Sequence, residues 1–317
     1  MSAARTTARL LRAYPPAWRR RYGEELESLI AEASGGGRVS WRTRLDVLSG
    51  GARERIRSAG LEPGGSPADR LRASALLILC AWALSVLGGL VVGKSSEHWQ
   101  DAVSSGSDSL ASVAYAVLVG AACCGSAFVL GGLAAAAPSF VRFLRRGGWR
   151  RVHRPLGRAA LLAAGLVAAT AALSLWGGSL DSHQREGGDV AYAIAFVAWA
   201  LWLVATIAAL TGAAVAIANQ VELPNRVLRV HAWLGAATAI AMATITAATI
   251  VWWVALADAA PWFFSGQRAA EGGSALSPQL FVAVAIMVVG TLLGGKGARR
   301  ALGQLPALSI RARAEPR

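Results

Sequence analysis

A glycine-rich segment near the C-terminus, Gly290–Gly297, is the stretch whose spacing comes closest to a site with chemistry. It nearly matches the Gly-x-x-x-x-Gly-Lys-Ser/Thr loop, in which backbone N–H groups cradle phosphates and the final hydroxyl binds Mg²⁺. Gly297 stands where that hydroxyl is needed, and the segment ends an apolar helix without a preceding strand and loop. We therefore expect no nucleotide binding and interpret Lys296 as an anchor at the membrane surface.

The histidines and cysteines are not spaced as metal ligands or catalytic groups are. Structural zinc sites place their Cys and His ligands a few residues apart, and nucleophilic catalysis needs a base within reach of the nucleophile. Here the histidines are scattered, the cysteines fall within long apolar segments, and no paired carboxylates stand out. We therefore predict no metal, no cofactor and no enzyme activity. The residues concerned are His98, His153, His183, His231, Cys80, Cys123 and Cys124.

Six long apolar segments occupy most of the chain after residue 72. Five of them have 18 or more mainly apolar residues, enough to cross a hydrocarbon core of about 30 Å, and the sixth has 14. The predicted fold class is therefore all-α, with a small N-terminal domain followed by a six-helix transmembrane bundle. The predicted spans are Ala73–Val92, Ser109–Ala136, Ala159–Trp176, Val190–Ile217, Val230–Ala257 and Leu280–Leu293.

Arginine marks every second connection between these segments. Met1–Arg72, Pro138–Arg158, Asn219–Arg229 and the tail from Lys296 are net basic, whereas the connections between them are net acidic. Because basic loops stay on the cytoplasmic side, both termini are predicted to be cytoplasmic in a multi-pass protein of the plasma membrane. The net charge of +14 therefore requires no nucleic acid, and we expect the lipid bilayer as the partner of these loops.

The residues before the spans predict three short amphipathic helices. Tyr14-Pro15-Pro16 ends the first, about Ala4–Ala13, because proline disfavours a helical residue before it. The second starts near Ala17 and ends at Ser34–Gly37, and the third has Ser40 as its N-cap. The predicted divisions are a cytoplasmic domain over residues 1–60, a flexible linker over 61–72, the spans over 73–295 and a basic cytoplasmic tail over 296–317.

Apolar stripes on the second and third helices leave two interpretations open. Three such helices in about sixty residues make a thin core. Either the stripes pack on each other in a self-contained bundle, or part of the apolar surface is kept for a partner. The stripes are Trp18, Tyr22, Leu26, Leu29, Ile30 and Ala33 in the second helix, and Trp41, Leu45, Leu48, Ala52 and Ile56 in the third.

The segment Leu10–Leu26 resembles a motif of membrane proteins. It contains Tyr-Pro-x-x-Trp-Arg-x-Arg-Tyr-Gly-x-Glu, which precedes transmembrane helices in many actinobacterial proteins. With six predicted spans, the chain is similar to the six-helix membrane anti-sigma factors that control extracytoplasmic-function sigma factors, including those of lantibiotic gene clusters. Frequent Arg, Ala and Gly are typical of the same GC-rich bacteria. No His or Cys precedes Cys80, so the zinc-binding type of anti-sigma domain is excluded.

This resemblance implies a regulatory function for the N-terminal helices. They would bind a sigma factor, cover the surfaces that engage RNA polymerase, and release it on a signal. Aromatic and Arg residues are the usual anchors of such interfaces. The expected partner-binding residues are Tyr14, Trp18, Arg19, Arg21, Tyr22, Glu24, Glu25, Leu26, Leu29, Trp41, Leu45 and Leu48.

Two other functions stay open. The chain could be a permease-like transport component or an immunity protein, with an N-terminal domain that recruits another factor. The spans hold almost no ionisable residues, which weakens the case for ion-coupled transport without excluding transport. Small residues such as Gly88-Gly89 and Gly131-Gly132 allow helices to approach closely, either within one bundle or in a homodimer.

Overall fold

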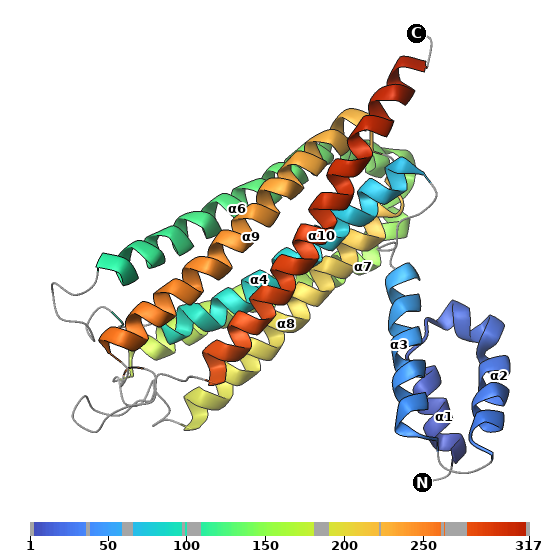
Figure 1. The fold of residues 1–317 in the computed structure, drawn as a ribbon, viewed down its shortest axis with the longest axis horizontal. Coiled ribbons are helices and arrows are strands. Elements are labelled where there is room, and N and C mark those ends of the chain that lie inside the picture. Colours follow the sequence, from blue (N-terminus) through green and yellow to red (C-terminus); the bar gives the residue numbers. More distant parts are fainter. Residues whose placement is uncertain are drawn as a thin grey trace. The chain divides into compact units, whose positions relative to one another are not determined.

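The computed structural model describes residues 3–35, 39–58, 66–96, 99, 109–180, 190–221, 223–260, 263 and 278–314. These residues form helices joined by short turns, without a strand among them, so the predicted all-α class is confirmed (Figure 1). The chain divides into two compact units, Met1–Gly65 and Ser66–Arg317.

The first unit contains three helices, α1 (Ala3–Leu11), α2 (Pro16–Ala33) and α3 (Trp41–Ser58). The helix α1 ends two residues earlier than expected, because the N–H groups of residues 12–14 bond to carbonyls only three residues back. The predicted cap of α3 is confirmed: the Thr43 N–H donates to Ser40 Oγ at 3.2 Å.

Five helical stretches are long and apolar enough to cross a membrane, one fewer than the sequence predicts. The difference lies in Leu110–Gly178, a run of 69 residues that contains the second and third predicted spans. It comprises α6 (Ser109–Phe143), a π-helical turn η1 (Leu144–Gly148) and α7 (Trp149–Gly178). The backbone leaves helical geometry inside η1, where Gly147 has φ 82° and ψ 11°. Such a left-handed conformation favours glycine.

The remaining long helices are α4 (Pro67–Ser95), α8 (Val190–Ala218), α9 (Asn225–Ala259) and α10 (Pro278–Ala314). The helix α4 begins at Pro67, six residues before the predicted span, because Ser66 Oγ caps it by accepting from the Asp69 N–H at 3.1 Å. The second half of the expected linker is therefore helical, while residues 61–65 lie outside the described residues. Gly290–Gly297 lies inside α10 and forms no phosphate-binding loop.

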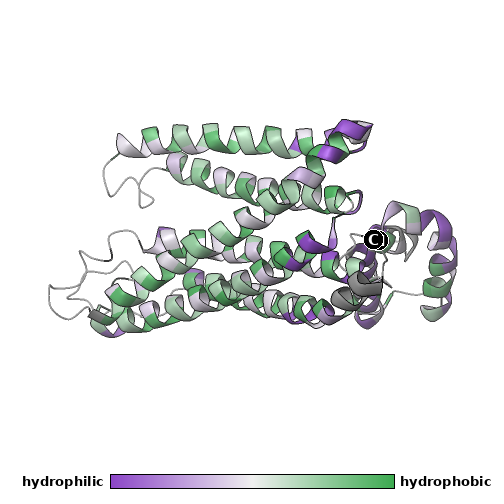
Figure 2. Ribbon diagram, turned by 90° about the horizontal axis from the view of Figure 1, so that it is seen from above, coloured by the Kyte–Doolittle hydropathy of each residue, from purple (hydrophilic) through white to green (hydrophobic). Residues whose placement is uncertain are grey.

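The helices of the second unit pack in two groups. The helix α10 packs on α4 and α9, and α9 packs on α6, whereas α7 pairs with α8, which in turn contacts α4 (Figure 1). The Trp202 Nε1–H donates to the Leu162 carbonyl at 3.1 Å and ties α8 to α7. Hydrophobic residues cover these helices along most of their length, and hydrophilic residues gather near one end (Figure 2).

Glycine permits a close contact between α10 and α4, and a substitution of this glycine can test the contact. A Cβ on Gly290 of α10 would lie 2.9 Å from the Ala81 carbonyl oxygen of α4, whereas one on Gly295 would meet nothing within 4 Å. Gly290→Ala should therefore lower the free energy of unfolding of the detergent-solubilised protein by about 1–3 kcal/mol, because the helices must move apart. The control Gly295→Ala should leave that free energy unchanged or raise it slightly. Equal effects of both variants in denaturant unfolding would contradict the close contact.

Candidate partner-binding surface of the N-terminal unit

The core of the first unit forms around the turn between α1 and α2. The helix α1 packs against both α2 and α3. Tyr14 is buried at this turn, and burial together with the negative charge of Glu54 raises the pKa of its hydroxyl. The other fully buried apolar residues of the cluster are Leu10, Ile30, Val39 and Val47. So few large side chains leave much of the apolar surface of the three helices uncovered.

Two glycines and one arginine of α3 hold this turn in place. A Cβ on Gly50 would lie 2.5 Å from the Tyr14 hydroxyl, and a Cβ on Gly51 would lie 2.6 Å from Ala13 Cβ, so α3 approaches the turn as closely as glycine allows. Arg55 donates from Nε to the Ala13 carbonyl at 2.5 Å and from Nη2 to the Arg12 carbonyl at 2.6 Å. These bonds satisfy carbonyls at the end of α1 that the helix itself leaves free.

Three aromatic residues run from this core to the surface along α2. Tyr14 and Trp18 stack with ring centroids 4.0 Å apart, and Trp18 contacts Tyr22 with centroids 5.3 Å apart. Tyr14 is buried, Trp18 is half-buried and Tyr22 is exposed. The Arg21 guanidinium lies over the Tyr22 ring at 5.2 Å, a cation–π contact. Tyr22 and Arg21 thus form the accessible end of an aromatic series anchored in the core.

The residues of α2 that the sequence proposes for partner binding differ in how far they are exposed. Leu26 is half-buried against the core, as Trp18 is, whereas Leu29 is exposed. Glu24 and Glu25 are exposed on α2. The Nε atom of half-buried Arg19 is buried and makes no hydrogen bond among the described residues. Tyr14 is a core residue here and contributes to a surface only by positioning Trp18.

The apolar stripe of α3 faces away from the core. Trp41, Leu45 and Leu48 are 66%, 54% and 45% exposed, and their i, i+4, i+7 spacing places them on one face of the helix. The Arg42 guanidinium lies 5.7 Å from the centre of the Trp41 ring. Of the two interpretations left open by the sequence, this stripe fits the second, because nothing in the described part of the unit covers it. We call these three residues the α3 stripe.

The opposite face of α3 contains the residues that sequence reasoning missed. Val47, Gly50, Gly51 and Glu54 recur at helical spacing, and this face packs on α1 and the turn. Two of the four are glycines, so this face has few apolar side chains. The α3 stripe therefore dominates the apolar pattern of this helix in the sequence. The adjacent glycines Gly50 and Gly51, three and four residues after Val47, could have indicated this packed face, because adjacent glycines inside a helix need a packing reason.

Comparisons with known proteins add no functional information about these residues. No protein-family model matches the chain, and no curated protein or solved structure is significantly similar to it. Among the described residues, no three His, Cys, Asp or Glu side chains lie close enough to hold a metal ion. The chemistry that the surface offers is therefore apolar contact and charge pairing.

The Arg55 contacts predict a specific loss of stability in the first unit. Arg55→Ala removes both bonds to the α1 carbonyls and should destabilise the unit by about 1–3 kcal/mol. In the full-length protein, amide hydrogen exchange over residues 3–33 should accelerate roughly 5- to 150-fold. Arg53→Ala, an exposed arginine on the same helix, should leave exchange unchanged. Similar acceleration in both variants would mean that the two bonds do not hold the turn.

Proposed function

We propose that this protein is a membrane-bound anti-sigma factor that sequesters an extracytoplasmic-function sigma factor through its N-terminal unit. The observation that carries the proposal is the α3 stripe, an exposed aromatic and aliphatic face on the small N-terminal unit. Large aromatic residues with neighbouring arginines are the common anchors of protein interfaces. The Tyr-Pro-x-x-Trp-Arg-x-Arg-Tyr-Gly-x-Glu segment supports the same assignment through its resemblance to membrane anti-sigma factors. Its second aromatic residue, Trp18, links the core of the unit to Tyr22.

The chemistry of the surface indicates what the sigma factor must present. The α3 stripe fits an apolar groove, and its burial removes Trp41, Leu45 and Leu48 from water, each worth about 1.5–3 kcal/mol when fully buried. Arg21 is exposed, and it would donate a charge-assisted hydrogen bond to a carboxylate of the partner. In this proposal the complex hides the sigma factor from RNA polymerase until a signal shifts the population of the two states.

We further propose that the membrane unit crosses the bilayer six times, with both termini in the cytoplasm. A straight helix of 69 residues would be about 100 Å long, whereas about 20 residues cross the hydrocarbon core. The helices α6 and α7 each exceed that length, and Gly147 breaks the helical geometry between them. The seven arginines of Pro138–Arg158 support a cytoplasmic position for this break.

Cysteine labelling tests this topology. In a variant in which alanine replaces Cys80, Cys123 and Cys124, a single cysteine at Gly147→Cys should react with a membrane-impermeant maleimide only after the cells are opened. A single cysteine at His183→Cys should react in intact cells, because residue 183 belongs to an acidic connection. Labelling at position 147 in intact cells would contradict the six-span arrangement.

Co-purification tests the proposed function. The full-length protein should retain the sigma factor encoded beside its gene, and Trp41→Ser with Leu45→Ser should reduce that binding more than about 30-fold, as loss of a hot spot of 2 kcal/mol or more does. Because both side chains are exposed, the variant should fold normally. The control Asp46→Ser with Arg53→Ser changes two exposed residues on another side of α3 and conserves net charge, so it should bind as the wild type does.

The outcomes of this experiment separate the proposals. Loss of binding in the stripe variant, with repression of a sigma-dependent promoter relieved in parallel, supports the anti-sigma function. Equal binding by the stripe and control variants would move the interface away from α3. Failure of the wild-type protein to retain the sigma factor would overturn the function itself and leave transport or immunity as the alternatives.

A further inference from the structure

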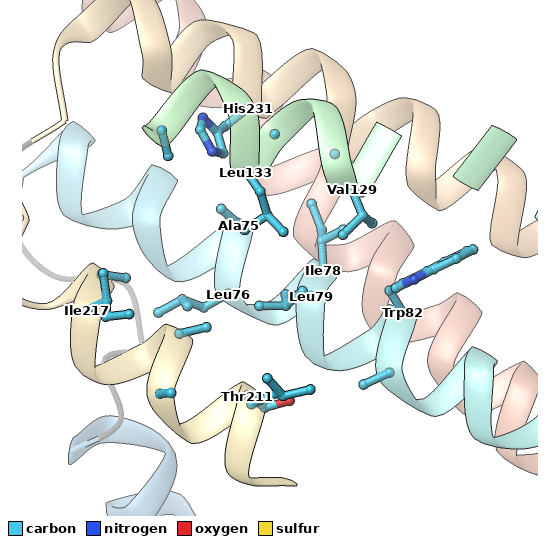
Figure 3. Close-up of a pocket in the computed structure, with 18 of the residues that line it drawn as sticks. Ala75, Leu76, Ile78, Leu79, Trp82, Val129, Leu133, Thr211, Ile217 and His231 are labelled. Atoms are coloured by element: carbon cyan, nitrogen blue, oxygen red, sulfur yellow. The ribbon is translucent and has the colours of Figure 1, made fainter. Parts of the chain in front are cut away.

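An apolar cavity of about 780 Å³ lies inside the second unit. Residues of α4, α6, α7, α8 and α9 line it, so it occupies the space between the two groups of helices. Figure 3 shows Leu76, Leu79 and Trp82 of α4 facing this space, with Leu133 of α6 on one side and Thr211 of α8 on another. Its volume falls within the range of small-molecule sites, about 300–1,000 Å³.

The lining of this cavity excludes water as its main content. Apart from the indole of Trp82, the polar side chains among the described residues that line it are Arg72, Thr211, His231 and Thr238. The Thr238 hydroxyl already donates to the Leu234 carbonyl of its own helix at 2.8 Å. A buried water needs two to four polar partners, and an apolar cavity of this kind stays dry or takes up an apolar ligand. Within a bilayer, the apolar ligand at hand is a lipid hydrocarbon chain.

The two ionisable groups of the cavity, Arg72 and His231, lie at the same end of it. Arg72 lies near the start of α4 and His231 near the start of α9, beside the ends of α6 and α8 and the start of α7. The His231 Nδ1–H donates to the Val227 carbonyl at 2.8 Å, which leaves Nε2 next to Gly132 of α6. Figure 3 shows the His231 ring at the same end as Ile217, away from Trp82. A ligand in this cavity therefore meets a polar end and an apolar interior.

Arg72 is the group whose hydrogen bonding is incomplete. Its Nε atom is buried and makes no hydrogen bond among the described residues. Its Nη1 atom lies 3.7 Å from the Asp69 carboxylate, which is half exposed, so this ion pair is weak. Arg72 has 23% of its side chain exposed, and the two terminal nitrogens of an arginine match two oxygens of a phosphate. Each charge-assisted bond is worth about 1.5–3 kcal/mol.

We propose that the cavity binds one anionic phospholipid of the surrounding bilayer, with a hydrocarbon chain between α4, α6 and α8 and its phosphate on Arg72. Hydrocarbon in the cavity restores the dispersion contacts that an empty space lacks. Those contacts do not distinguish one lipid from another, because lipid tails are as apolar as the lining. The choice of headgroup therefore depends on Arg72. This site stands apart from the α3 stripe and does not rest on the proposed function.

Native mass spectrometry of the full-length protein tests the proposal. The delipidated protein in detergent is mixed with phosphatidylglycerol or phosphatidylcholine carrying the same two oleoyl chains. The wild type should retain one phosphatidylglycerol molecule about tenfold more tightly than phosphatidylcholine, because the zwitterionic headgroup carries its own cation. Arg72→Gln should abolish this preference. Arg70→Gln, which removes an equal charge from the exposed side of the same helix, should preserve it.

Two further measurements separate the tail from the headgroup. Ala75→Trp places a large side chain where Ala75 of α4 faces the cavity, and it should reduce retention of both lipids. Glycerol phosphate, the water-soluble headgroup analogue, should displace neither lipid, since it lacks the chain. Thermal unfolding of each variant verifies that it is folded.

Three results would overturn the proposal. The first is equal retention of phosphatidylglycerol by the wild type and by folded Arg72→Gln. The second is retention by folded Ala75→Trp equal to that of the wild type, which would place the lipid elsewhere on the membrane surface of the protein. The third is full displacement of lipid by glycerol phosphate, which would make the site one for soluble phosphates.

Discussion

The close approach of α4 and α10 is the contact from which the other helices of the membrane unit take their positions. Hydrophobic burial provides little drive for helix association in lipid, so van der Waals contact and hydrogen bonding decide it. Gly290, Gly294 and Gly297 share one face of α10, and added Cβ atoms there would meet the Ala81 carbonyl, Met242 and Ile78. The same face therefore serves both α4 and α9. Gly290, the first glycine of the segment that resembles a phosphate-binding loop, is therefore a residue of this helix contact, whereas Gly295 is not.

Glycine has the same role in the N-terminal unit, with a different consequence. Gly50 and Gly51 bring α3 against the Tyr14 turn, and this places the core on the side of α3 that has the fewest apolar side chains. The larger side chains of the helix then lie on the opposite side, in the α3 stripe. In this unit the close backbone approach and the Arg55 bonds add to the buried cluster around Tyr14, and Trp41, Leu45 and Leu48 remain exposed.

The sequence predicts where the long helices lie in the chain, but it predicts less well which other segments pack around each helix. Local signals define the cap at Ser40, the end of α1 before Pro15 and the apolar length of each long helix, because each depends on residues close together in the chain. The sequence predicts two spans within Leu110–Gly178, because arginines interrupt its hydropathy, whereas the helical run continues through these arginines and leaves helical geometry at Arg146 and Gly147. The direction in which the α3 stripe faces depends on α1, and the cavity depends on five helices, so neither follows from any one segment.

The pairing of α7 with α8 has a mechanical consequence. This pair joins the rest of the membrane unit through η1 at one end and through the contact of α8 with α4. A stiff body held in this way turns most easily about the line through its attachments, with the non-helical residue Gly147 taking up the change in backbone angles. Such a rotation would change the separation of α6 and α8, the two walls of the cavity, and the thickness of a molecule between them would limit it.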